Sequence, residues 1–224
     1  MQVFVAEQGY GDRETKAEYV YSKYKAILEG KKILDVGADK CYLRNHLTEG
    51  ASYWGIGFGE VDQEVDPEDG KLPFDDQSFD TVLCLDVLEH LEKIHYVFDE
   101  LCRVSKEFVV LSLPNPWMGF YKFLRRGHAL SYDPMKFYGL PLEPPEDRHR
   151  WFFSAEEAER FIAYRSERSG FRVLQMDNEN AKIVGEGRGF KGWIKELAKW
   201  ILLRNPIDSK NLYGSTTWAV LQRK

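Results

Sequence analysis

Three short, continuously apolar segments limit what this chain can fold into. Residues 32–36 (KILDV), 79–85 (FDTVLCL) and 108–113 (FVVLSL) have the length and composition of strands that are covered on both faces of a sheet. Between the second and third segments, apolar residues recur at helical spacing over residues 88–104. A strand, a helix and a second strand of this kind form a right-handed βαβ unit. The sequence therefore predicts a parallel sheet with helices packed on it.

Further segments extend this unit to a sheet of seven strands. Ser154 and Glu157 have the spacing of a capping box at the start of a helix. Only seven residues separate Gly57 from Val65, too few for a crossover helix. We predict a Rossmann-like three-layer α/β/α sandwich with a mostly parallel seven-stranded sheet and an antiparallel last strand. The remaining predicted elements are helices at residues 12–29, 41–47 and 154–168 and strands at residues 53–57, near Val65, at 171–176 and at 216–222.

Length and composition favour one soluble domain. The chain has 224 residues, of which 43% are hydrophobic and 30% are charged. We divide the single domain, residues 1–224, into an N-terminal helix (12–30), a cofactor-binding core (31–113) and two insertions (115–150 and 180–212). The first insertion is rich in Pro, Gly, Tyr and Trp without a sustained period, which is typical of functional loops or lids. We expect both insertions on the substrate side.

Charge, cysteine and histidine content argue against several classes of function. A net charge of -5 and a pI near 5.6 disfavour a surface that attracts nucleic acid. The sequence shows neither a secretory signal nor a run of about eighteen apolar residues, so we expect a cytoplasmic protein. The three cysteines are widely spaced and the five histidines form no paired ligand motif. We therefore expect neither disulfides nor a metal site.

The turn after the first strand is the best candidate for a ligand site. Asp35 lies near the end of this strand, and Gly37 opens the turn Gly37-Ala38-Asp39-Lys40-Cys41. Backbone N–H groups at such a strand-to-helix turn face a nucleoside-bearing cofactor. The GxGxxG pattern that a dinucleotide pyrophosphate requires is absent, which disfavours a nicotinamide oxidoreductase. A cofactor without phosphate tolerates more side chains in this loop.

Three sequence blocks in succession resemble a known family. The order KKILDVG, LPFDDQSFDTVLCLDVLEHL and ELCRVSKEFVVLSLPNP is similar to the class I S-adenosylmethionine-dependent methyltransferases of the methyltransferase type 11 group. The resemblance covers residues 31–115 and continues more weakly in RHRWFFSAEEAERF and SGFRVL. Its most specific part is residues 72–91, and residues 104–127 look closest to the methionine-biosynthesis W-type branch. The resemblance implies S-adenosylmethionine as the cofactor.

The resemblance also implies which residues bind this cofactor. Asp35 and Gly37 would hold the methionine ammonium group, with Ala38 and Asp39 along the same moiety. Leu85 and Asp86, at the end of the fourth strand, would line the methionine and methyl region, where the acceptor must arrive. The adenine amine would lie near Glu68 or Asp69.

Two departures from the family pattern put the site in question. Asp39 and Cys41 stand where the family has glycines that permit a tight turn and close approach. Gly57 stands where an acidic residue normally ends the second strand and binds both ribose hydroxyls, so Glu60 or Asp62 would have to substitute from the following loop. The alternative is a degenerate, non-catalytic methyltransferase-fold module that binds a partner protein.

Methyl transfer from a sulfonium depends mainly on aligning the two reactants. A base is needed only if the acceptor must lose a proton, and His90, Asp86 and His149 are the candidates. In the family the position of His90 more often supports the helix. Asn115 in LPNP follows the fifth strand rather than the fourth, so we interpret it as a turn residue.

Two aromatic and basic segments are the most individual feature of the chain. They are residues 117–126 (WMGFYKFLRR) and 190–204 (FKGWIKELAKWILLR), of which the second has an apolar face at helical spacing. Such a helix usually packs on the core. The alternative is a hydrophobic lid or a contact with a membrane surface, which would give access to a hydrophobic or aromatic acceptor. Taken together, the sequence predicts an S-adenosylmethionine-dependent methyltransferase that acts on a small molecule.

Overall fold

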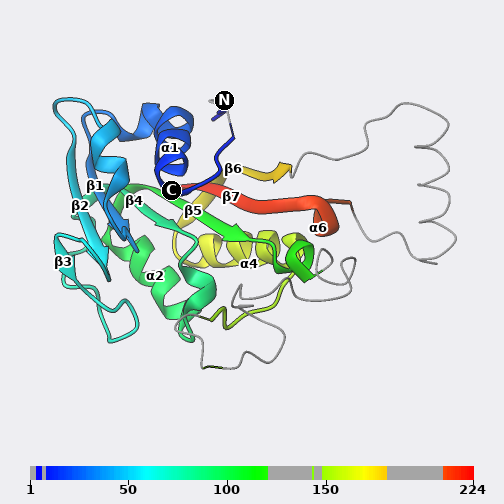
Figure 1. The fold of residues 1–224 in the computed structure, drawn as a ribbon. Coiled ribbons are helices and arrows are strands. Elements are labelled where there is room, and N and C mark those ends of the chain that lie inside the picture. Colours follow the sequence, from blue (N-terminus) through cyan, green and yellow to red (C-terminus); the bar gives the residue numbers. More distant parts are fainter. Residues whose placement is uncertain (1–3, 7–8, 121–142, 144–147, 181–208) are drawn as a thin grey trace, which may run out of the picture.

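The computed structural model describes residues 4–6, 9–120, 143, 148–180 and 209–224 (Figure 1). The long second aromatic segment, residues 190–204, lies outside this description, as does the first segment beyond residue 120. Within the described residues, no helix is both long and apolar enough to cross a membrane. The helices are α1 (Arg13–Leu28), α2 (Ile94–Val104), α4 (Ala155–Arg168) and α6 (Ser209–Tyr213), with 3₁₀ helices η1 (Tyr42–His46) and η2 (Leu88–His90). Residues 116–120 are also helical. The strands are β1 (Lys32–Val36), β2 (Ser52–Gly57), β3 (Gln63–Glu64), β4 (Phe79–Leu85), β5 (Ser105–Pro114), β6 (Phe171–Asn180) and β7 (Gly214–Arg223).

The strands form one seven-stranded sheet in the order β3-β2-β1-β4-β5-β7-β6. Strands β3, β2, β1, β4 and β5 pair with one another in parallel. Strand β7 lies between β5 and β6 and is antiparallel to both. The predicted mixed sheet with an antiparallel last strand is therefore confirmed. The strand order reverses between β1 and β4, which makes the carboxyl ends of these two strands the topological switch point where α/β folds bind ligands.

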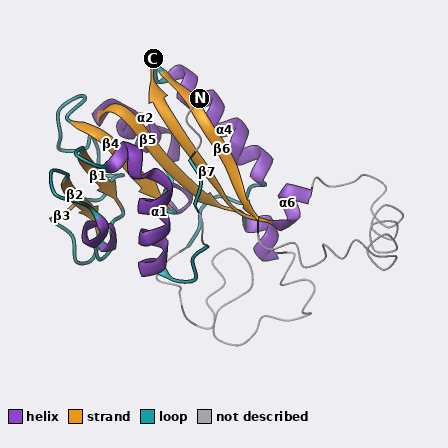
Figure 2. Cartoon of the chain, turned by 90° about the horizontal axis from the view of Figure 1, so that it is seen from above, coloured by secondary structure: helices purple, strands orange, loops and turns teal. Residues whose placement is uncertain are grey.

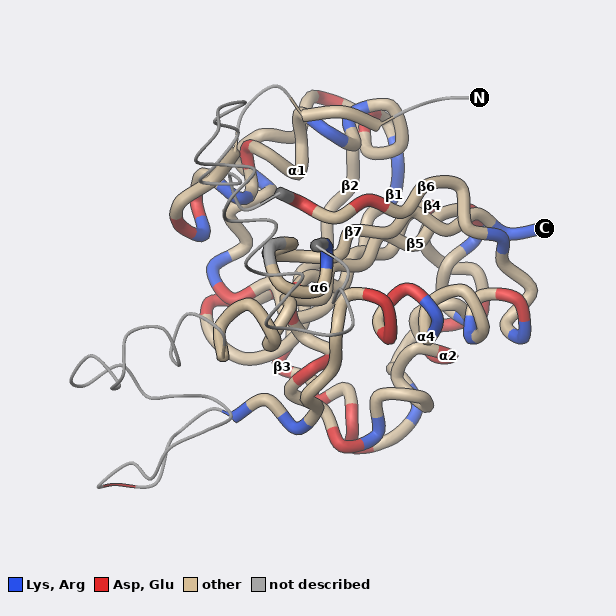
Figure 3. The backbone as a smooth tube through the Cα atoms, turned by 90° about the vertical axis from the view of Figure 1, so that its right-hand side faces the viewer, with Lys and Arg blue, Asp and Glu red and all other residues tan. Residues whose placement is uncertain are grey.

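Helices cover both faces of the sheet, so the predicted three-layer sandwich is also confirmed. Figures 1 and 2 place α1 on one face and α2 and α4 on the other. On the α1 side, Val20, Tyr24 and Leu28 pack with Trp218 of β7 in one buried cluster. On the other side, α2 and α4 contribute Phe98 and other apolar residues to a second cluster. Acidic and basic residues are interspersed along the outer helix α4 (Figure 3).

Both long predicted helices at residues 12–29 and 154–168 form, and each begins with a capping box. The Asp12 side chain accepts from the backbone N–H of Thr15, and the Ser154 side chain accepts from that of Glu157. Each bond satisfies a backbone donor that has no partner within the helix. The capping box predicted at Ser154 is therefore confirmed.

Two predicted helices are shorter than the apolar spacing indicates. The pattern at residues 41–47 becomes only the 3₁₀ helix η1, because Asp39 and Cys41 both have a φ of 53° and turn the chain left-handed just before it. The pattern at residues 88–104 divides into η2 and α2. Lys93 precedes α2 outside helical geometry, and its backbone N–H donates to Glu68 Oε1 at 2.6 Å instead of to a helical carbonyl.

No helix lies between β2 and β3, as the short spacing predicts. β3 comprises only Gln63 and Glu64 and so begins two residues before Val65. The short connection folds back on itself, since Asp62 N donates to Gly55 O at 3.0 Å and Val65 N donates to Gly57 O at 3.2 Å. This edge of the sheet therefore keeps its strand without the usual crossover.

Candidate functional site

A cavity of about 520 Å³ opens at the switch point of the sheet. Its volume lies within the range of small-molecule and cofactor sites. Residues expected from the sequence that line it are Asp35, Gly37, Ala38, Asp39, Leu85, Asp86, His90 and His149. It is also lined by Arg13, Lys16, Ala17 and Val20 of α1, Tyr42 and Leu43 of η1, and Glu89 and Pro114.

The turn after β1 reaches this cavity through an unusually close approach of backbone. Gly37 has a φ of 81°, and a Cβ atom there would lie 2.2 Å from Val87 Cγ2, so no side chain fits. The N–H groups of Gly37 and Ala38 both donate to the carbonyl of Ile56, at 2.8 and 3.1 Å. The turn is thus fixed to the end of β2, although only one of the family's glycines remains.

The side chains that replace the missing glycines leave the cavity open. Asp39 lines the cavity and forms an ion pair with Arg13 of α1. Lys40 forms an ion pair with Glu60 at 3.5 Å, and Cys41 Sγ donates to the carbonyl of Glu60 at 3.5 Å. Neither Lys40 nor Cys41 is among the residues that line the cavity. The left-handed turn at Asp39 and Cys41 therefore directs these two side chains toward the β2–β3 loop.

Asp35 places a buried carboxyl group in the wall of the cavity. It is 8% exposed, and Tyr53 donates its hydroxyl to Asp35 Oδ2 at 2.7 Å. Burial raises the pKa of Asp35 to about 6, and both the Tyr53 hydrogen bond and the positive charge of Lys16 oppose this rise. Near neutral pH the group is ionised and can accept from a cationic ligand.

Asp86 presents a second carboxylate immediately after β4. Its φ of 55° is unusual for a residue with a side chain. Three contacts hold it in this conformation, because its N–H donates to the Ser112 carbonyl at 3.1 Å, Oδ1 accepts from the Ser112 hydroxyl at 2.5 Å, and Oδ2 pairs with Lys16 Nζ at 2.6 Å. A residue held at such a backbone conformation beside a cavity is a candidate for function.

Three residues expected near the cofactor do not line the cavity, namely Gly57, Glu68 and Asp69. Glu68 instead accepts from the backbone N–H of Lys93, as described above. Gly57 has a φ of 130°, and a Cβ atom there would lie 3.1 Å from the Cα of Gly37. An acidic side chain at this position would therefore collide with the turn after β1.

The two carboxylates proposed as substitutes for the ribose-binding acid have other partners. Asp62 Oδ2 accepts from Gly55 N at 2.7 Å and forms an ion pair with Arg44. Glu60 is exposed and pairs with Lys40. The Asp39 carboxylate also has a partner, Arg13, but unlike Asp62 and Glu60 it lines the cavity, where it lies against Gly59 of the β2–β3 loop.

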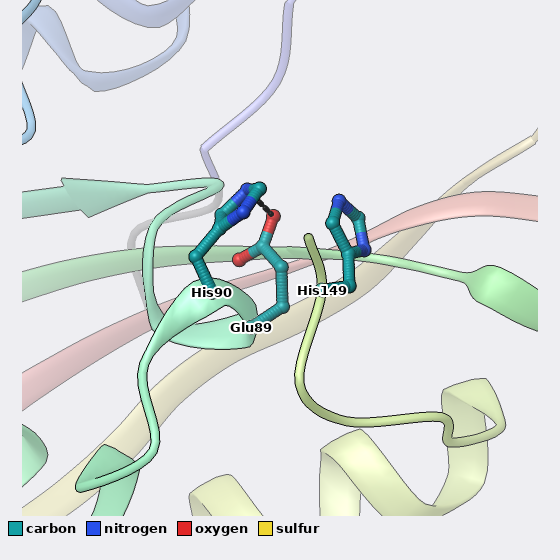
Figure 4. Close-up of side chains that lie close together, drawn as sticks. All are labelled: Glu89, His90 and His149. Carbon is teal, nitrogen blue, oxygen red and sulfur yellow. Dashed lines mark ion pairs between the residues drawn. The ribbon is translucent and has the colours of Figure 1, made fainter. Parts of the chain in front are cut away.

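In the lining of the same cavity, η2 and the segment before α4 bring together Glu89, His90 and His149 (Figure 4). The imidazole rings of the two histidines are 4.4 Å apart, and His90 Nε2 lies 3.5 Å from Glu89 Oε1. Glu89 is 1% exposed, and this burial raises its pKa. The structure therefore places both candidate histidine bases beside a buried carboxyl group.

Sequence reasoning missed the contribution of the N-terminal helix to the site. Arg13, Lys16, Ala17 and Val20 are spaced by three, one and three residues, which puts them on one face of α1. That spacing was visible, but the sequence did not show that this face meets the carboxyl ends of β1 and β4. Asn115, which we interpreted as a turn residue, instead lies between β5 and the helical residues 116–120, where Oδ1 accepts from Trp117 N and Nδ2 donates to the Asn211 and Gly214 carbonyls.

Comparison with known families agrees with this architecture. A family model described as a methyltransferase domain, that of the type 11 group, matches residues 43–111, slightly less than a third of the chain. No curated protein matches the sequence at a significant level. The resemblance to the type 11 group is thus confirmed, whereas nothing supports the narrower likeness to the methionine-biosynthesis W-type branch.

Solved structures of similar fold extend the likeness over nearly the whole chain. An S-adenosylmethionine-dependent methyltransferase from Archaeoglobus fulgidus is 20% identical with a TM-score of 0.54, covering 96% of this chain and 95% of that one. Magnesium protoporphyrin IX methyltransferase from Synechocystis PCC 6803, solved with bound SAH, is 14% identical with a TM-score of 0.53, covering 96% and 90%. The cyclase SpnF is 13% identical with a TM-score of 0.55, covering 99% and 87%. At these identities the likeness establishes the fold, that of the class I methyltransferases.

Proposed function

We propose that this chain, which carries a methyltransferase domain on the class I methyltransferase fold, binds S-adenosylmethionine at the switch point and transfers its methyl group to a small-molecule acceptor. The observation that carries this proposal is the open cavity between β1 and β4, with the Asp35 carboxyl group in its wall. The cavity stays open even though Asp39 and Cys41 stand in the turn. A structure of similar fold with bound SAH supports the choice of cofactor.

The chemistry of the cavity wall fits the methionine end of this cofactor. The Asp35 carboxylate and the carbonyl groups of the turn at Gly37 accept from an ammonium group, and Ala38 lies along the same moiety. Leu85 supplies apolar contact for the carbon chain, and Asp86 lies at the methyl end. When bound, the cofactor supplies a methyl group that its sulfonium charge already activates.

The ribose hydroxyls require an acceptor that Gly57 does not provide. We assign this role to Asp39, whose carboxylate lines the cavity beside Gly59 of the β2–β3 loop. Its ion pair with Arg13 orients the carboxylate. The charge-assisted hydrogen bonds lost with the family's acidic residue, each worth about 1.5–3 kcal/mol, would thereby be replaced from the neighbouring loop. The adenine remains assigned to the side of Glu68 and Asp69, which lie outside the cavity.

Acceleration of the transfer comes mainly from aligning the acceptor with the methyl group. The acceptor enters at the end of the cavity lined by Asp86, His90 and His149. If the acceptor must lose a proton, one of these three groups takes it. The insertions at residues 115–150 and 180–212 remain assigned to the acceptor side, and a hydrophobic or aromatic acceptor fits their composition.

A thermal-shift comparison of S-adenosylmethionine, S-adenosylhomocysteine and NAD tests the cofactor. A ligand at 100 times its Kd stabilises the native state by about 2.7 kcal/mol, which raises the Tm of a chain of this size by roughly 5 to 10 °C. We expect this shift with both sulfur compounds and none with NAD. Stabilisation by NAD alone would overturn the proposal.

The second candidate is the non-catalytic module, which the glycine at position 57 favours. In that case the protein binds a partner protein through a retained fold, as fold alone does not determine function. Tight binding of S-adenosylmethionine without its consumption, across a broad panel of hydroxyl, thiol and amine acceptors, supports this candidate. Formation of S-adenosylhomocysteine with any acceptor in the panel excludes it.

A further inference from the structure

We propose that Glu89, His90 and His149 form a binding site for a divalent transition-metal ion at the acceptor end of the cavity. Among the described residues, these three have one ligand atom each within 4.8 Å of one another. Figure 4 shows the side chains of Glu89, His90 and His149 close together and directed the same way. Two imidazoles and one carboxylate are a ligand set for a catalytic type of metal site.

The burial of Glu89 is the observation that most needs an explanation. Its side chain is 1% exposed, and the contact of Oε1 with His90 Nε2 is long, at 3.5 Å; neither carboxylate oxygen has a hydrogen bond of good geometry from a described residue. A buried carboxylate without hydrogen bonds is strongly destabilising unless a positive charge compensates it. A divalent cation supplies that charge and occupies the oxygen lone pairs. Protonation of the carboxyl group is the competing explanation, which the test below separates.

The positions of the three ligands are fixed by elements that are far apart in the sequence. Glu89 and His90 belong to η2, directly after β4. His149 is held against η2 by two flanking bonds, since Arg150 N donates to the Glu89 carbonyl at 2.8 Å and Trp151 Nε1 donates to the Leu91 carbonyl at 2.6 Å. The segment before α4 is therefore bound to η2 at the place where the three ligand atoms meet.

The spacing of the ligand atoms requires only a small adjustment. Two donors that each lie about 2.1 Å from a tetrahedral ion are about 3.4 Å apart. The ligand atoms, which now lie within 4.8 Å of one another, must therefore approach by roughly 1 Å. Rotation of the side chains achieves this without a movement of the backbone. Imidazole ligands favour Zn²⁺, Fe²⁺ or Co²⁺, whereas Mg²⁺ and Ca²⁺ prefer sites made of oxygen atoms.

Three protein ligands leave at least one coordination position open. All three line the same cavity as Asp35 and Asp86, so the open position faces the proposed acceptor. This role rests on the proposed methyl transfer. An acceptor hydroxyl or thiol bound to the ion would have a lowered pKa and would give its proton to Asp86, the one candidate base that is not a ligand of the ion. Its lone pair then forms the bond to the methyl carbon, and the electrons of the broken carbon–sulfur bond remain on sulfur.

Titration with Co²⁺ and Zn²⁺ after removal of metal by a chelator tests the site. We expect one ion per chain and a visible Co²⁺ absorption typical of four- or five-coordinate nitrogen and oxygen ligands. His149→Ala removes one ligand from a segment outside the regular elements and should weaken binding by more than about 100-fold. Glu89→Gln preserves the shape of the side chain and should weaken metal binding to a similar extent.

His95→Ala is the matched control, because His95 contacts the rings of Trp151 and Phe161 nearby and is no member of the cluster. We expect it to bind the ion as the unchanged protein does, and thermal unfolding verifies that each variant is folded. If the unchanged protein, His149→Ala and Glu89→Gln all bind the metal ion equally well, the bound ion is an adventitious ion only. Absence of binding would mean that Glu89 is buried as a neutral acid. Either result overturns the proposal.

The same preparations separate this proposal from the proposed function. The S-adenosylmethionine thermal shift is measured on chelator-treated protein. A shift without metal binding leaves the methyltransferase assignment and removes the metal site. Metal binding without a thermal shift leaves the metal site and removes the methyltransferase assignment.

Discussion

Two glycines that face each other across the end of the sheet shape the cavity. A Cβ atom on Gly57 would lie 3.1 Å from the Cα of Gly37, and one on Gly37 would overlap Val87. Both residues have positive φ angles. A side chain at position 57 would therefore crowd the turn after β1 and would also have to adopt a strained φ.

Restoring the family's acidic residue should consequently damage the protein. Gly57→Asp combines a strained φ with a steric clash, and we expect it to lower the free energy of unfolding by roughly 2 to 4 kcal/mol. Gly70→Asp is the control, since Gly70 has a φ of 144° but no atom within 4 Å of its added Cβ. It should lose only about 1 to 2 kcal/mol. Denaturant unfolding measures both, and tighter binding of cofactor by Gly57→Asp would contradict this account.

The raised pKa of Asp35 predicts how cofactor affinity depends on pH. An ammonium ligand binds the carboxylate form, which is depleted as pH falls below about 6. The Kd for S-adenosylmethionine should therefore increase about tenfold per pH unit below this value and level off above it. Isothermal titration between pH 5 and 8 measures the profile.

Asp35→Asn is the matching control for this profile. It should bind more weakly at pH 8 and should lose the slope below pH 6. A slope that persists in the variant would assign it to another group. For the fold itself the sign is opposite: because the folded pKa exceeds the ordinary 3.8, burial of Asp35 is best tolerated below pH 3.8 and costs stability as pH rises to about 6.

Among individual residues, the sequence predicted about half of those that line the cavity. Asp35, Gly37 and Asp86 were accessible because they follow strands whose ends must meet at one edge of a parallel sheet. The proximity of Glu89 and His149 could not be predicted from the sequence, because these residues are far apart in the chain and form no local motif. Contacts between distant segments depend on packing, which residue spacing does not encode.

Among the elements, α1 connects stability to the site most directly. Its first turn carries Arg13 and Lys16, which pair with Asp39 and Asp86 of the cavity wall. Its capping box at Asp12 holds this turn in helical geometry. The capping box of α4 at Ser154 has the same form but lies at a helix that does not line the cavity.

These two caps form a matched pair for mutation. Ser154→Ala should lower the free energy of unfolding by about 1 kcal/mol and leave cofactor affinity unchanged. Asp12→Ala should lower the Tm and also weaken cofactor binding, because fraying of the first turn displaces Arg13 and Lys16. Equal effects of the two variants on the Kd for S-adenosylmethionine would show that α1 does not shape the site.

Helices and strands could be predicted from the sequence where their own hydrophobic pattern or a local cap determines them. The strands at residues 79–85 and 108–113 and the helix beginning at Ser154 follow from hydrophobic runs and a local cap. The prediction of one helix over residues 88–104 was wrong, because the helix is interrupted before Lys93. The backbone N–H of Lys93 donates to Glu68 from another segment instead. A tertiary hydrogen bond of this kind leaves no periodic signal in the sequence.

On the scale of the whole molecule, one sheet joins two hydrophobic clusters. Trp218 of β7 is fully buried on the α1 side, where its ring lies 6.0 Å from that of Tyr24 and 5.3 Å from that of Tyr19. The next residue, Ala219, belongs to the cluster on the opposite face. Because strands alternate their side chains between faces, loss of packing on one face weakens the other.

Trp218→Ala should therefore destabilise the described fold as one unit. We expect a loss of about 3 to 5 kcal/mol in the free energy of unfolding. Near-ultraviolet and far-ultraviolet circular dichroism should give the same lowered Tm, since both clusters share the sheet. Two separate transitions would show that the faces unfold independently.

The antiparallel strand β7 also has a consequence for how the chain is made. Val110 of β5 pairs with Val220 of β7, so one edge of β5 has to wait for residues translated much later. At a synthesis rate of about 5 to 20 residues per second, that edge stays without its neighbour for roughly 5 to 20 seconds. An exposed strand edge invites pairing with other nascent chains. Until β7 has been made and has paired, this edge of β5 is therefore open to association with other chains.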